Sequence, residues 1–150
     1  MNIEIFSSKK FPGRALLLSF ARAVCKTEKI LHRPGKIALI FVSAKKLRQI
    51  NVQFLGHDYD TDVISFPYAA PRRAVSSDFP FGDIYISMDM ARAQAKAGGH
   101  NLNQELALMV LHGLLHLAGY KDHLSADRRK MFRRQRQLFH RCLPHLPYPD

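Results

Sequence analysis

Three closely spaced histidines are the part of this sequence with the clearest chemistry. His112 and His116 are four residues apart, so on a helix they lie on one face, one turn above the other. Gly119 stands where a left-handed C-terminal cap would end that helix, and His123 follows on a chain that has turned back. Three neutral imidazoles with a fourth position open form a catalytic zinc site. The spacing predicts one Zn²⁺ per chain, bound by His112, His116 and His123.

The alternative is a structural role for these histidines. A single histidine in an apolar helix is more often a hydrogen-bonded core residue than a metal ligand. A second histidine one turn later favours the metal, and a third after the helix-ending glycine favours it again.

A metal bound by three neutral imidazoles keeps its double positive charge, which suits the cleavage of a phosphodiester in a polyanion. The metalloprotease pattern H-E-x-x-H places a glutamate directly after the first histidine as general base. That position is Gly113 here, so a peptidase would lack its base. Gly113 leaves room either for a ligand or for another element packed closely on the helix.

Two acidic residues near the histidines could assist the chemistry. Glu105 is seven residues before His112, near the same helix face, where its carboxylate could orient an imidazole. The helix dipole also favours a glutamate in the first turn, without any role in the site. Asp122 could orient a ligand, bind the metal, act as a base, or simply belong to the turn.

The histidine-bearing helix is predicted over residues 103–118, and further elements must position it. The apolar run at 36–42 predicts a strand buried on both faces. In the helix that Ser43 caps, Phe54 is predicted to face the core and Gly56 to end the helix. The remaining predicted elements are strands at 3–6, 61–68 and 81–86 and helices that begin near Pro12, Ser87 and Ser125.

The order strand, helix, strand, helix, two strands and then helices predicts an α+β or α/β fold. We expect α+β, with about four strands in one mixed sheet, helices packed on it, and the metal site on a central helix. A chain of 150 residues predicts one domain, 1–150, that buries roughly 70% of its unfolded surface.

The charge indicates a polyanionic partner. The chain has 23 Lys and Arg residues and 12 Asp and Glu residues, which give it a net charge of +11. Such a charge favours nucleic acid as the partner over an acidic membrane surface. Some small cytoplasmic proteins are simply basic. The predicted last helix nevertheless concentrates the charge, since it holds Arg128, Arg129, Lys130, Arg133, Arg134, Arg136 and Arg141.

Nothing in the sequence indicates a membrane or an export route. No apolar run approaches membrane-spanning length, and MNIEIFSSKK lacks the long apolar segment of a signal peptide. We therefore expect a cytoplasmic protein in which Cys25 and Cys142 are free thiols.

The segment HGLLHLAGYKDH, from His112 to His123, resembles the signature of the YbeY family, bacterial rRNA maturation factors and endoribonucleases with three metal-binding histidines. TDVISFP at 61–67 and GDIYIS at 82–87 resemble the two other recurring segments of that family, in the same order and spacing. Three blocks together are much more specific than any one of them.

The resemblance implies a metal-dependent, single-strand-specific endoribonuclease of ribosomal RNA maturation and ribosome quality control. It implies that Thr61, Asp62 and Ser65 lie by the active site, and the residues themselves add Glu105 and Asp122 as catalytic candidates. The implied partners are ribosomal RNA and the ribosome or its assembly proteins. The competing hypothesis is a non-catalytic rRNA-binding assembly factor with a structural metal. A metal-dependent hydrolase of another substrate is disfavoured by the basic charge.

One departure from the family concerns catalysis. Common members have an arginine, thought to take part in RNA cleavage, in a Y-R-G-K-D-like stretch. The matching residues here are FLGHD at 54–58, so Leu55 stands at the arginine position. Leu55 favours the non-catalytic hypothesis unless Arg72, Arg73 or His57 supplies the charge.

A second departure concerns the third ligand. Lys121 is an extra residue, which leaves six residues between His116 and His123 where the family has five. A turn accommodates one extra residue as a bulge, so His123 is still predicted as the third ligand.

Overall fold

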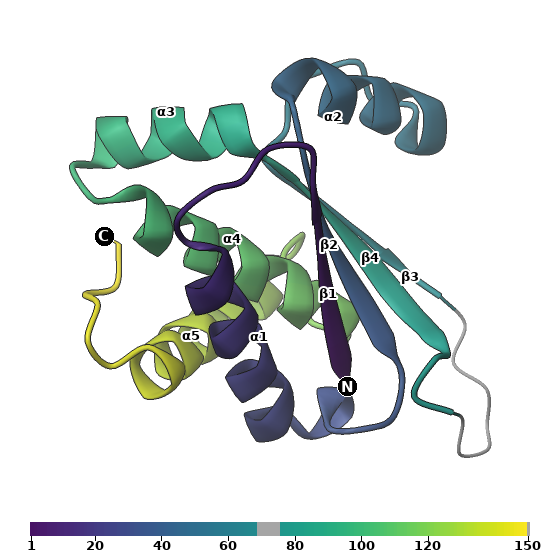
Figure 1. Cartoon of the computed structure of the whole chain (residues 1–150), viewed down its shortest axis with the longest axis vertical. Helices are drawn as coiled ribbons and strands as arrows, with labels where there is room; N and C mark the ends of the chain where they lie inside the picture. The colour runs from purple at the N-terminus through teal and green to yellow at the C-terminus, as the bar shows by residue number, and fades with distance from the viewer. Residues whose placement is uncertain (69–75, 150) are drawn as a thin grey trace.

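A four-stranded sheet carries most of the helices on one face (Figure 1). The computed structural model describes residues 1–68 and 76–149. Its strands are β1 (Asn2–Ser7), β2 (Lys36–Val42), β3 (Val63–Pro67) and β4 (Pro80–Ser87). Its α-helices are α1 (Arg14–Thr27), α2 (Ala44–Ile50), α3 (Met88–Gly98), α4 (Leu102–Leu117) and α5 (Ser125–Cys142). The predicted α+β fold with a mixed sheet is confirmed.

The strand order is β1-β2-β4-β3. β1, β2 and β4 run parallel, and β3 pairs antiparallel with β4 at the edge. Burial alternates along β2, where Ile37, Leu39 and Phe41 face the main core and their neighbours are half-buried. The prediction that β2 is buried on both faces is therefore wrong. The second face is covered only in part, by a small cluster that α2 makes with Ile64.

α4 is the central helix of the fold. It packs against α1, α3, α5, β3 and β4 and is buried on nearly every side, as an almost wholly apolar helix should be. A capping box between Asn101 and Gln104 begins it, and Gly119, with a φ of +99°, follows its end as predicted. Among the described residues, no helix has both the length and the apolar character needed to cross a bilayer.

Two glycines let α4 approach the sheet closely. A Cβ on Gly113 would lie 2.6 Å from Cγ2 of Ile84 in β4, and one on Gly82 would lie 2.7 Å from Cδ2 of Leu117. Of the two interpretations of Gly113, close packing is therefore the one that the structure supports. The contact brings the histidine face of α4 up against β3.

The segment after α2 differs from the prediction. Ser43 caps α2 by accepting from the Lys46 N–H, but the helix then widens into a π-helical segment, Asn51–Leu55, before Gly56 ends it with a φ of +69°. The wider turn takes Phe54 off the buried face, so its ring is exposed instead of inward. Leu55 next to it faces the site described below.

Candidate metal centre

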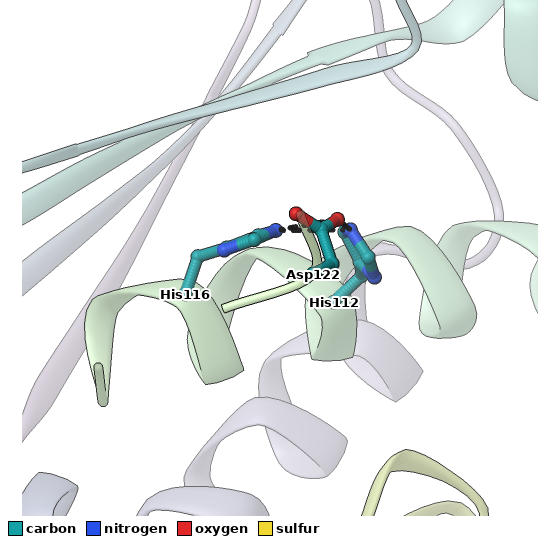
Figure 2. A group of neighbouring side chains, drawn as sticks. All are labelled: His112, His116 and Asp122. Carbon is teal, nitrogen blue, oxygen red and sulfur yellow. Dashed lines mark hydrogen bonds and ion pairs between the residues drawn. The ribbon is translucent and has the colours of Figure 1, made fainter. Parts of the chain in front are cut away.

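The side chains of His112, His116 and Asp122 meet beside the last two turns of α4, and Figure 2 shows the carboxylate pointing at both imidazoles. The two Nε2 atoms are 3.1 Å apart. Oδ2 of Asp122 lies 3.6 Å from Nε2 of His112 and 3.4 Å from Nε2 of His116. The three ligand atoms could hold one metal ion.

Each imidazole is oriented through its other nitrogen. Nδ1 of His112 lies 3.0 Å from Oε1 of Gln135 on α5, and Nδ1 of His116 lies 3.1 Å from the carbonyl oxygen of Tyr120. Both oxygens can only accept, so both Nδ1 atoms carry the proton and donate. The Nε2 atoms are then left with lone pairs directed at each other and at Asp122.

This arrangement fits a metal cation. Two nitrogen lone pairs 3.1 Å apart, with a carboxylate beside them, repel one another unless a cation lies between them. Burial and the neighbouring His112 lower the pKa of His116, against the opposing effect of Asp122, so His116 is neutral at neutral pH and available as a ligand. Two imidazoles and one carboxylate are a ligand set of catalytic zinc sites.

Asp122, and not His123, is the third member of this cluster among the described residues. His123 is exposed and lies in the wall of the same cavity. Lys121 lengthens the chain between Gly119 and these two residues, and in the structure this turn brings the aspartate to the imidazoles. The assignment of His123 as a ligand stays a prediction.

A cavity of about 550 Å³ opens onto the cluster. Its wall is formed by α4, β3, the turn before β3, the end of the π-helical segment and the chain after Gly119, and it includes Thr61, Asp62 and Ser65. The hydroxyl of Ser65 donates to the carbonyl oxygen of Gly113 over 3.1 Å, which ties β3 to α4 next to His112. The carboxylate of Asp62 accepts from Gln94 on α3 over 3.4 Å.

Glu105 contacts His100 and not the imidazole of His112, which the sequence indicated as its possible partner. Its buried carboxylate, in the first turn of α4, pairs with Nε2 of His100. The side chain that orients His112 is Gln135, which is held in turn by the Tyr148 hydroxyl 2.9 Å away. Sequence reasoning missed Gln135. The available signal was a polar residue one turn after Met131 on the buried face of the last helix.

Replacing Gln135 should lower the affinity for the metal, although Gln135 is not itself a ligand. We expect Gln135→Leu to lower zinc affinity by about 10- to 100-fold, the usual effect of losing a group that orients a ligand. The control is Gln137→Leu, an exposed position on the same helix. Competition with a chromogenic chelator measures both affinities. Equal affinities in the two variants would remove Gln135 from the site.

His57, Arg72 and Arg73 are the candidates for the positive charge that Leu55 does not supply. Leu55 and His57 both lie in the cavity wall, where the His57 ring stacks on Tyr59 at a centroid distance of 5.2 Å. Nδ1 of His57 is 3.0 Å from the Tyr59 hydroxyl. Arg72 and Arg73 lie outside the described residues.

The chain is similar to known proteins over most of its length. The family described as Endoribonuclease YbeY matches residues 4–143. Proteins named Endoribonuclease YbeY from Elusimicrobium minutum and Endomicrobium trichonymphae are 37% and 40% identical to this chain. The first alignment covers 87% of this chain and 92% of that protein, and the second covers 93% and 94%. The solution structure of TM1509 from Thermotoga maritima is similar at a TM-score of 0.64 and 26% identity, over 95% of this chain and 89% of that one.

Proposed function

Because the chain belongs to the family of the endoribonuclease YbeY, we propose that it cleaves single-stranded RNA with the help of one zinc ion, in ribosomal RNA maturation and ribosome quality control. The observation that carries this proposal is the cluster of His112, His116 and Asp122 in the wall of a 550 Å³ cavity. The net charge of +11 supports a polyanionic substrate. We assign the activity to the cytoplasm.

The metal would supply a Lewis acid for a phosphoryl oxygen and a lowered pKa for a bound water. The protein supplies the rest. Gln135 and the Tyr120 carbonyl hold the imidazoles with Nε2 toward the cavity. We assign proton acceptance from the attacking water to Asp62, a carboxylate in the cavity wall that is not part of the ligand cluster.

The test is cleavage of a single-stranded RNA by protein purified without a polyhistidine tag. We expect cutting by the zinc-loaded protein, loss of cutting after chelation, and recovery when zinc is returned. A duplex of the same sequence should be cut far more slowly. Cutting that survives complete removal of the metal would contradict the proposal, because the cluster would then have no part in the reaction.

We propose ribosomal RNA, on the ribosome or with its assembly proteins, as the partner of the basic α5. Six basic residues of α5 are exposed: Arg128, Arg129, Lys130, Arg133, Arg136 and Arg141. Arg134 is different, because its Nε donates to the buried carboxylate of Glu28 over 2.9 Å, so it braces α5 against the end of α1. The RNA-binding surface is therefore assigned to the exposed subset.

Replacing Arg129 and Arg133 with alanine should flatten the salt dependence of RNA binding. Each phosphate contact on a single strand contributes a slope of about −0.7 in log affinity against log salt, so two lost contacts should change it by about 1.4. Fluorescence anisotropy across a salt series measures this. Lys9→Ala with Lys10→Ala, two exposed lysines after β1, is the matched control. Equal slopes in the two double variants would move the RNA surface away from α5.

The second candidate is an rRNA-binding assembly factor whose metal only braces the fold. The observation in its favour is Leu55, an apolar side chain in the cavity wall at the position where the family pattern has an arginine. Binding of RNA without any cutting by metal-loaded protein would favour it.

A further inference from the structure

A second, smaller cavity adjoins the metal centre. It has a volume of about 260 Å³ and shares Asp62, Val63 and His112 with the first cavity, so the two meet beside the metal cluster. Phe132 of α5 lies in its wall, with its ring centroid 6.4 Å from that of His112. The Phe132 side chain is 44% exposed, although most of the other exposed residues of this helix are basic.

An aromatic pair borders the first cavity as well. The Tyr59 side chain is exposed, and its ring lies nearly parallel to that of His57, with an interplanar angle of 16°. The buried side chain of Asn51 donates to the Tyr59 carbonyl oxygen over 3.1 Å and fixes this turn. Each of the two cavities that meet at His112 therefore has an exposed aromatic side chain in its wall.

We propose that the two cavities are nucleotide subsites on either side of the scissile phosphate, with one base stacked on Phe132 and the other on Tyr59. The assignment rests on the proposed function, since it takes the metal cluster as the place of that phosphate. Aromatic side chains are the usual stacking surfaces for single-stranded bases, because every base presents a π-face. The high positive charge of the chain argues for RNA over a protein as the occupant.

The neighbours of Phe132 suit a nucleotide. Arg128 and Arg129 lie one turn before it on α5, so both flank its side of the helix. Arg128 already donates to the Asp122 carbonyl oxygen, which leaves Arg129 as the candidate for a backbone phosphate. Gln94 in the same cavity wall offers its amide oxygen to a base edge. A base in a duplex is stacked and paired with its own neighbours, so only an unpaired strand can place bases here.

Phe132→Trp turns this subsite into a fluorescent reporter, because the chain contains no other tryptophan. The ligands are a short single-stranded RNA and the same backbone with all bases removed, both added to metal-free protein so that binding is measured without cleavage. We expect the RNA to quench the emission and the abasic strand not to. Phe6→Trp is the matched control, since Phe6 is 50% exposed and lines a different cavity on the open face of the sheet. Its emission should not change with either ligand.

Affinity gives an independent measurement. Phe132→Ala and Tyr59→Ala should each weaken binding of the RNA about tenfold, the scale of one lost stacking contact, and should leave the abasic strand unchanged. Equal quenching by both strands, or equal affinities of wild type and Phe132→Ala for the RNA, would overturn the proposal. Normal RNA binding together with lost binding of a ribosomal protein would instead assign Phe132 to protein docking. These readouts do not need cleavage, so an inactive protein that shows the quenching would contradict only the proposed function.

Discussion

His112→Ala and His116→Ala should each abolish stoichiometric zinc and, with it, RNA cleavage. Both Nε2 atoms face the same point, and each Nδ1 is already committed to an oxygen acceptor. Removing either imidazole leaves one nitrogen and one carboxylate, too few donors for a stable zinc site. Elemental analysis of protein purified without a polyhistidine tag measures the metal. A full complement of zinc in either variant would show that the assignment is wrong.

The same measurement decides the third ligand. If Asp122 binds the metal as the geometry indicates, Asp122→Ala should lose zinc and His123→Ala should retain it. Deleting Lys121 restores the spacing of the family pattern. In the Asp122→Ala background, that deletion should return zinc binding by carrying His123 toward the two imidazoles. The reverse pattern, with zinc lost in His123→Ala alone, would restore the ligand set predicted from the sequence.

Leu55→Arg should accelerate RNA cleavage by about 100-fold, because a cation close to developing phosphorane charge is typically worth a few kcal/mol. The Leu55 side chain is 45% exposed and lies in the cavity wall, so an arginine there has both room and a path to the phosphate. Val52→Arg is the matched control. Val52 is also 45% exposed, in the same π-helical segment, but is not part of the wall of that cavity.

Single-turnover rates under saturating RNA separate the two arginine variants. Faster cutting by Leu55→Arg alone supports a charge acting at the reaction centre. Equal acceleration by Val52→Arg would point to a general gain in RNA affinity. No cutting by wild type or by Leu55→Arg, in protein that contains zinc and binds RNA, would contradict the catalytic proposal and leave the assembly factor.

Local rules explain why much of the fold was predictable. Ser43 and Ser87 cap the helices that follow them, and Gly99 and Gly119 turn the chain after α3 and α4 with positive φ angles. Each of these residues acts on backbone groups a few positions away, so the sequence alone contains the information. The helical pair of histidines was predictable for the same reason.

The features that were missed depend on long-range contacts. Gln135 contacts His112 from another helix, and the residues next to Gln135 in the sequence give no indication of that contact. The place of Asp122 depends on how a turn with one extra residue folds back on α4. Arg134 is one of the basic residues of α5, yet its guanidinium is paired with the carboxylate of Glu28. Counting charges along a helix does not tell which of them remain available to a ligand.

The contact between Gln135 and Tyr148 has a consequence for the order of events during translation. Synthesis runs from the N-terminus, so α4 and its two histidines leave the ribosome before α5, and α5 before Tyr148. The Tyr148 hydroxyl fixes Gln135, which fixes His112. A nascent chain therefore displays the histidines before it can orient them, and the centre matures only when the segment after α5 has emerged.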